Sequence, residues 1–230
     1  MYLKMWLTTL IGNNEIIALT RSQTINIPVS TKYDDQIDID LSRCFPSMRK
    51  HRKVLKDILK AYTFSAVGIG YAQGINFLIC PLYKHLLIDN EKNAFSDTFF
   101  CLQRVMRLVL PIYPLHKEDS LPLHYSSNLA VLLRRDTHFP AEWLDEVQCF
   151  LLRYWPTMLS NMFDLEQLEV LWSYILMGTT DILRLKRLYK IFVNIFLINS
   201  SLYKINKYSA FKLLSNADFH DTKLLINHTQ

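Results

Sequence analysis

The scarcity of turn-forming residues is the feature that most restricts the fold of this chain. Its 230 residues include only 5 glycines and 8 prolines, while 50% of the residues are hydrophobic. Tight hairpin turns depend on glycine and related turn residues, so a fold made of many hairpins is not expected. A chain of this length and apolar content can bury about 70% of its unfolded surface. Its composition therefore excludes the possibility that the chain as a whole is a disordered tail.

Apolar residues recur at helical spacing along nearly the whole chain. In residues 50–62 they form one stripe opposite lysines and arginines, and residues 71–87 are apolar on almost all sides. The second pattern predicts a central buried helix with Pro81 inside it, where proline removes a backbone hydrogen bond. Strand-like alternation is confined to residues 23–30. Further helices are predicted at 95–110, 120–135, 141–153, 165–177, 181–198 and, more weakly, 207–216.

Together these patterns predict an all-α fold with no significant β-sheet. Asp97, Asp164 and Asp181 are predicted N-terminal caps, and Gly178 fits a helix C-terminus. No repeat, low-complexity tract or linker interrupts the chain. We therefore expect one domain over residues 1–230, with an N-terminal helical subregion at 1–110 and a C-terminal one at 111–230.

Charge and cysteine usage exclude several classes of function. The 26 basic residues exceed the 21 acidic ones only slightly, so nucleic-acid binding is not expected. The 4 cysteines are scattered and the 7 histidines show no metal-ligand spacing, which predicts no metal site. Unpaired thiols are typical of a reducing compartment, so we expect a cytoplasmic protein. No apolar run approaches the roughly 20 residues of a transmembrane helix.

Three of the five glycines fall within VGIGYAQGIN, residues 67–76. One explanation is a tight turn ahead of the buried helix; the other is a loop that presents Tyr71 and Gln73 to a partner. The glycine spacing fits neither a phosphate-binding P-loop nor a dinucleotide-binding loop.

A second segment, IDIDLSRCFP at residues 37–46, contains Asp40 and Arg43 three positions apart. On a helix this spacing brings the two side chains together, so the carboxylate could orient the guanidinium. Taken alone, such a pair is routine on protein surfaces and contributes little to stability.

In combination the two segments resemble the TBC domain, the catalytic module of GTPase-activating proteins for Rab GTPases. The family carries I-x-x-D-x-x-R followed by Y-x-Q, and its members are all-helical. Here the motifs read Ile37, Asp40 and Arg43, then Tyr71 and Gln73, with Phe45-Pro46 and Gly74-Ile75-Asn76 beside them. Residues 168–178, LEVLWSYILMG, are similar to a late family helix, with Ser173 where many members have an acidic residue.

The resemblance implies catalysis in trans by two residues. Arg43 would neutralise charge on the phosphates of a nucleotide held by a GTP-bound Rab GTPase, and Gln73 would position the attacking water. GTP and magnesium would belong to the partner, so the chain would need no cofactor of its own and would not itself be a GTP-binding hydrolase. The supporting or orienting residues would be Asp40, Tyr71, Ile37, Gly70, Gly74 and Asn76.

A basic run follows the candidate arginine finger. Arg49, Lys50, Arg52 and Lys53 could form a partner-facing surface that attracts an acidic GTPase or anionic lipid at endomembranes. The alternative is an ordinary solvated helix face. Two other functions also remain open: a TBC-like scaffold that binds a small GTPase or another protein without catalysis, and a helical module that docks on nucleic acid or acidic lipid.

Overall fold

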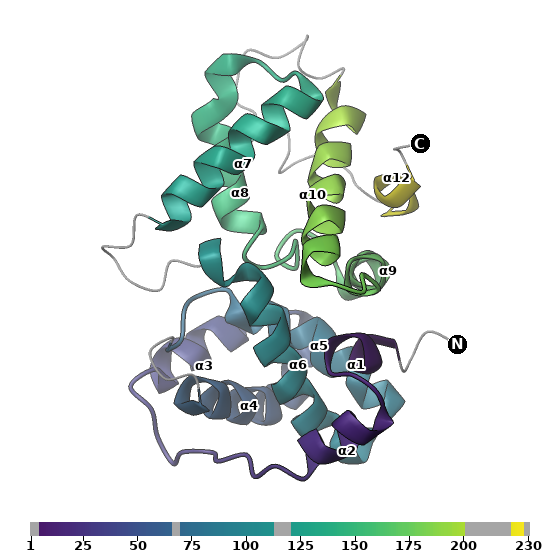
Figure 1. Cartoon of the computed structure of the whole chain (residues 1–230). Coiled ribbons are helices and arrows are strands. Elements are labelled where there is room, and N and C mark those ends of the chain that lie inside the picture. Colours follow the sequence, from purple (N-terminus) through teal and green to yellow (C-terminus); the bar gives the residue numbers. More distant parts are fainter. Residues whose placement is uncertain (1–4, 66–69, 113–120, 201–221, 228–230) are drawn as a thin grey trace. The chain divides into compact units, whose positions relative to one another are not determined.

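The computed structural model describes residues 5–65, 70–112, 121–200 and 222–227 (Figure 1). Every regular element in these residues is a helix, which confirms the all-α prediction. The described residues fall into two compact units, the first ending at Leu108 and the second beginning at Val109. The expectation of one domain over residues 1–230 stays a prediction.

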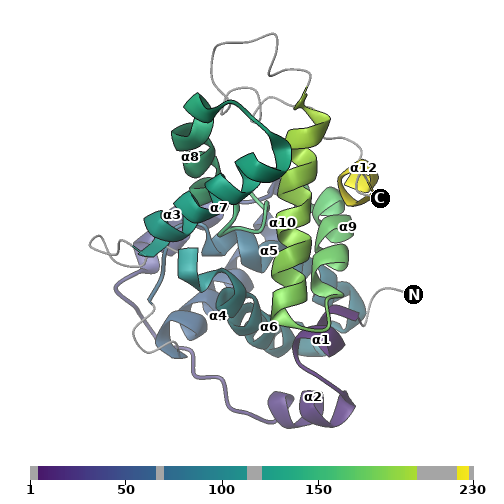
Figure 2. The ribbon, with the colours of Figure 1, turned by 45° about the horizontal axis from the view of Figure 1, so that its top comes forward.

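The first unit is built from six α-helices, which Figures 1 and 2 show from two directions. Within it α3 packs against both α4 and α5, α4 also packs against α5, and α1 packs against α2. Two short 3₁₀ helices, Pro46–His51 and Glu91–Asn93, precede α4 and α6. The six helices are α1 (Met5–Leu10), α2 (Asn14–Arg21), α3 (Asp34–Ser42), α4 (Arg52–Ser65), α5 (Ile75–Asp89) and α6 (Ala94–Val109).

Helix α5 is largely buried, as its apolar sequence predicts. Ten of its 15 residues are buried, and Pro81 lies inside the helix. The helix begins at Ile75, four residues later than predicted, because the preceding residues form a turn that ends at Gly74. That turn contains the Tyr-x-Gln motif. The motif therefore lies immediately before a buried helix.

An ion pair between a partly exposed arginine and a buried aspartate connects α2 with α6. Asp97 was expected to cap a helix, but it lies inside α6 and is only 3% exposed. Its carboxylate accepts two hydrogen bonds from Arg21, Nε to Oδ1 at 2.7 Å and Nη2 to Oδ2 at 2.5 Å. The capping prediction for Asp97 is therefore wrong, because this carboxylate is engaged by a distant guanidinium.

The second unit packs its helices around an aromatic core. Phe150 contacts Phe192 and Phe196 edge-on, with ring centroids 6.0 and 5.9 Å apart. Helix α10 packs against α7, α9 and α12, and α7 packs against α8. The helices are α7 (Leu121–Thr137), α8 (Leu144–Tyr154), α9 (Leu165–Leu176), α10 (Asp181–Ile198) and α12 (Thr222–Asn227). The helix predicted at 207–216 lies outside the described residues.

Of the two N-terminal caps predicted in this unit, one is confirmed and one is wrong. Asp164 caps α9 as predicted, accepting from the backbone N–H groups of Glu166 and Gln167. Asp181 is the first residue of α10, and Thr180 supplies the cap instead.

Nowhere in the described residues is there a helix whose length and apolar character would suffice to cross a membrane.

We predict that Arg21→Ala destabilises the first unit strongly. The substitution leaves the Asp97 carboxylate buried without its cation, and breaking a buried pair in this way costs about 3–5 kcal/mol. Chemical denaturation measures the change in the free energy of unfolding. Arg107→Ala, which removes an exposed arginine from α6, is the matched control and should change it by less than about 0.5 kcal/mol. An equal effect of the two substitutions would contradict the argument.

Candidate functional site

Arg43 lies at the C-terminal end of α3 with its side chain exposed. Its backbone N–H donates to the carbonyl of Asp40 at 3.1 Å, which closes the last turn of the helix. Within the described residues the guanidinium makes no hydrogen bond or ion pair. All of its donors are therefore available to a molecule outside this unit.

Asp40 does not orient Arg43 as the sequence suggested. Its side chain is buried and accepts a hydrogen bond from the hydroxyl of Tyr71 at 2.9 Å. The i, i+3 pair does not form because the Asp40 carboxylate is buried against Tyr71 while the Arg43 side chain is exposed. Asp40 shares the buried face of α3 with Ile37, which is fully inaccessible to solvent. The carboxylate therefore connects α3 to the Tyr-x-Gln motif.

The Tyr-x-Gln motif forms a turn whose shape depends on two glycines. Gly70 has φ +66° and Gly74 has φ +106°, both in the left-handed region that favours glycine. Gly74 is also the N-terminal cap residue of α5. Between them Tyr71 is buried and Gln73 is exposed, with no hydrogen bond from its side chain to the described residues. The turn thus points one motif residue inward and the other outward. Gly68 lies outside the described residues.

The buried side-chain amide of Asn76 forms hydrogen bonds to residues close to both Arg43 and Gln73. Asn76 donates from Nδ2 to the carbonyl oxygen of Asp40 at 3.1 Å and to Sγ of Cys44 at 3.1 Å. Its Oδ1 accepts from the backbone N–H of Gly74 at 3.0 Å. These partners lie three residues before Arg43, directly after Arg43 and directly after Gln73. Asn76 is 1% exposed, so the connection is shielded from water.

Cys44 takes a structural position in this network. The thiol is buried and donates to the carbonyl oxygen of Asn76 at 3.4 Å. A hydrogen bond with the thiol of Cys80 lowers the pKa of Cys44 and, together with burial, raises the pKa of Cys80.

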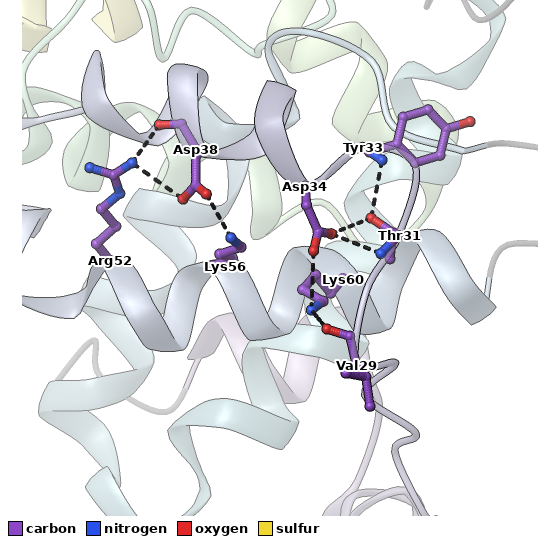
Figure 3. Close-up of polar contacts among 8 residues, drawn as sticks. All are labelled: Val29, Thr31, Tyr33, Asp34, Asp38, Arg52, Lys56 and Lys60. Carbon is purple, nitrogen blue, oxygen red and sulfur yellow. Dashed lines mark hydrogen bonds and ion pairs between the residues drawn. The ribbon is translucent and has the colours of Figure 1, made fainter.

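Part of the predicted basic face is engaged within the protein. Figure 3 shows that Asp38 of α3 is contacted by Lys56 at 2.6 Å and by Arg52 at 3.2 Å, both from α4. Asp34, one turn earlier, pairs with Lys60 at 3.4 Å. The hydrogen bond between Asp38 and Lys56 lowers the pKa of the carboxyl and raises the pKa of the amine. We call these residues (Asp34, Asp38, Arg52, Lys56 and Lys60) the α3–α4 ion pairs.

The remaining cations of the run stay exposed. Arg49, Lys50 and Lys53 have no side-chain hydrogen bond or ion pair to the described residues. Arg52, which was expected beside them in a partner-facing surface, instead helps to hold α3 on α4. The sequence did not reveal this division because the acidic partners lie 14 to 18 residues away.

Sequence reasoning also missed Tyr33, whose hydroxyl lies against the backbone of Gly70. No motif or helical spacing connects two residues so far apart.

Among the described residues, no group of three or more His, Cys, Asp or Glu side chains could hold a metal ion.

This arrangement defines an all-helical domain that presents an unpaired arginine and an unpaired glutamine on one network. The Rab-GTPase-TBC domain family matches residues 5–203, and the chain belongs to that family. The chain is 33% identical over 90 residues to Growth hormone-regulated TBC protein 1 of Homo sapiens, across 36% of this chain. It is 28% identical over 137 residues, 55% of this chain, to TBC domain-containing protein C1952.17c of Schizosaccharomyces pombe.

These matches cover only 25% and 22% of the lengths of the two relatives. A solved structure, the Ypt/Rab-GAP domain of Gyp1p, superimposes with a TM-score of 0.73 at 18% identity. The match covers 98% of this chain and 86% of that one. At this identity the likeness supports the fold.

We predict that Asn76→Ala destabilises the first unit by about 2 kcal/mol, because it leaves the buried N–H of Gly74 without an acceptor. Thermal and chemical denaturation measure the loss. Asn26→Ala, at an exposed position in the segment between α2 and α3, is the control and should change little. Equal stability of the Asn76 variant and the wild type would show that the bridge is not needed for folding.

Proposed function

We propose that this chain is a GTPase-activating protein for a Rab GTPase, with Arg43 and Gln73 as its two catalytic residues. Family membership and the name of the solved relative, a Ypt/Rab-GAP domain, support the partner class. The observation that carries the proposal is the Asn76 bridge. It fastens the chain beside both residues while leaving both side chains exposed. Catalysis in trans needs this combination of a fixed backbone and free functional groups.

Arg43 is chemically suited to neutralise the charge that develops on the phosphoryl group during its transfer. A guanidinium is planar and permanently charged, and its fork of donors can contact oxygens of two phosphates at once. Arg43 has its donors free, so no internal ion pair has to break before it engages the partner. An arginine supplied in trans can accelerate hydrolysis by about 10³–10⁵-fold.

Gln73 suits the task of holding the attacking water. Its side-chain oxygen can accept a hydrogen bond from water while its amide nitrogen donates to a phosphate oxygen. The buried Tyr71 and the Gly74 cap fix the backbone on both sides of it. In this proposal GTP and magnesium are carried by the GTP-bound partner, and the chain acts from the cytoplasm on membranes where that partner resides.

We predict that Arg43→Ala lowers the stimulated GTP hydrolysis rate by about 10³-fold and that Gln73→Ala lowers it by about 10²–10³-fold. Arg43→Lys should remain impaired, because lysine keeps the positive charge but lacks the planar guanidinium that can contact two phosphates at once. Single-turnover phosphate release from a panel of GTP-loaded Rab proteins is the measurement. Arg107→Ala, at another exposed arginine of the first unit, is the control and should keep full activity.

Two results would overturn this proposal. Full activity of Arg43→Ala would remove the arginine finger. Binding of the wild-type chain to a GTP-loaded Rab without any acceleration would instead indicate the non-catalytic scaffold.

We also propose that Arg49, Lys50 and Lys53 attract the acidic surface of the partner. They are exposed and unpaired, and they follow Arg43 within ten residues, so a GTPase bound at Arg43 would lie near them. Charges in this position mainly raise the rate of association, and salt weakens the effect because the screening length falls from about 10 Å at 0.1 M to about 3 Å at 1 M.

We predict that the double variant Lys50→Glu, Lys53→Glu lowers kcat/KM by about 10-fold at low salt and leaves kcat unchanged. The deficit should shrink steadily as salt is added. The matched control, Lys92→Glu with Arg107→Glu, makes the same change in net charge at exposed positions elsewhere in the first unit. An equal deficit in the control would indicate a net-charge effect, and loss of binding to anionic vesicles with normal kcat/KM would indicate a lipid-binding face.

A further inference from the structure

The side chain of Tyr33 lies directly against the glycine that opens the Tyr-x-Gln turn. A Cβ atom added to Gly70 would overlap the Tyr33 hydroxyl oxygen and lie 2.9 Å from the ring carbon that carries it. The Gly70 backbone and this hydroxyl are therefore in direct contact. The same ring lies 6.3 Å from the ring of Tyr71, inclined at 51°. Tyr33 thus contacts two of the three residues that precede Gln73.

Tyr33 is itself held firmly at the start of α3. Its backbone N–H donates to Oγ1 of Thr31 at 3.2 Å, and that hydroxyl donates to Asp34 at 2.6 Å. Lys60 of α4 pairs with Asp34 and donates to the carbonyl oxygen of Val29. Figure 3 shows these contacts, with the Tyr33 ring pointing away from the α3–α4 ion pairs. These contacts hold the Tyr33 backbone at the start of α3 and beside α4.

Helix α3 consequently contacts the turn from both of its ends. Tyr33 at its N-terminus contacts Gly70, and Asp40 near its C-terminus binds the hydroxyl of Tyr71. The two contacts are two helical turns apart, so together they restrict rotation of the turn as well as its displacement. Arg43 belongs to the same helix end as Asp40.

We propose that Tyr33 is a positioning residue for Gln73, an inference that rests on the proposed function. The ring keeps Gly70 and Tyr71 in place, so that the Gln73 amide meets the partner's nucleotide in one orientation. A shift of about 1 Å in a catalytic group can cost about 10²-fold in rate. Tyr33 acts through the turn and touches neither the nucleotide nor the water.

The test is a set of single and double variants assayed for Rab GTP hydrolysis. Tyr33→Ala is expected to lower kcat by about 10–100-fold with KM nearly unchanged, since Arg43 and the exposed cations are intact. Tyr33→Phe keeps the ring and should retain most of the activity. Phe64→Ala, which removes an exposed aromatic ring from α4, is the matched control and should behave as wild type.

Double variants separate positioning from a general loss of structure. In the Gln73→Ala background Tyr33→Ala should cause no further loss, whereas in the Arg43→Ala background it should cause its full loss. An equal loss in both backgrounds would overturn the proposal, because Tyr33 would then act through folding. A rise in KM with normal kcat would also overturn it, since Tyr33 would then contact the partner.

Hydrogen exchange at the backbone amides of residues 71–74 gives a readout that needs no partner. Tyr33→Ala should speed exchange there while exchange in α5 and α6 stays slow. Unchanged exchange at 71–74 would contradict the inference whatever the activity. Faster exchange in a protein that activates no Rab would leave the contact established and reject the proposed function instead.

Discussion

The side-chain amide of Asn76 is the interaction on which the candidate site depends. It satisfies a backbone carbonyl of α3, a backbone N–H at the start of α5 and the thiol of Cys44, all within a buried space. A buried polar group without a partner costs about 1–3 kcal/mol, so each of these bonds discourages separation of the two segments. The catalytic candidates are placed by this network although neither of them belongs to it.

A division of labour between buried and exposed polar groups follows from the same physics. Asp40 and Tyr71 satisfy each other inside the unit, and the α3–α4 ion pairs satisfy one another at its surface. An exposed pair such as Arg52–Asp38 is worth about 0–1 kcal/mol. Together the ion pairs fix the position of α3 along α4. Asp34 and Asp38 lie on successive turns of α3, and they contact Lys60 and Lys56 on successive turns of α4. The side chains of Arg43 and Gln73 make no hydrogen bond or ion pair within the described residues, as the proposed role toward a partner requires.

The sequence predicted what depends on local pattern and missed what depends on tertiary contact. Helical periodicity located α4 to α10 but not α2, α3 or α12, and the cap at Asp164 followed from neighbours within three residues. The pairings of Asp97 with Arg21 and of Tyr33 with Gly70 join residues that only the folded chain brings together. The Asp40–Arg43 pair failed for a related reason, since the Asp40 carboxylate is taken by Tyr71, a residue that only the folded chain brings near it. The motif residues were found, but not how they are held.

The glycines of VGIGYAQGIN form the tight turn that one explanation expected, whereas the other explanation, a loop presenting Tyr71 and Gln73, is wrong for Tyr71, because that side chain is buried against Asp40. Gly70 and Gly74 adopt backbone angles that other residues rarely reach, as a tight turn ahead of a buried helix requires. The same angles send Tyr71 inward to Asp40 and leave Gln73 outside. At Gly70 the absence of a Cβ also admits the Tyr33 hydroxyl. A residue there with a side chain would therefore meet two independent penalties, backbone strain and overlap with the ring, so Gly70 contributes both to the turn's shape and to its attachment to α3.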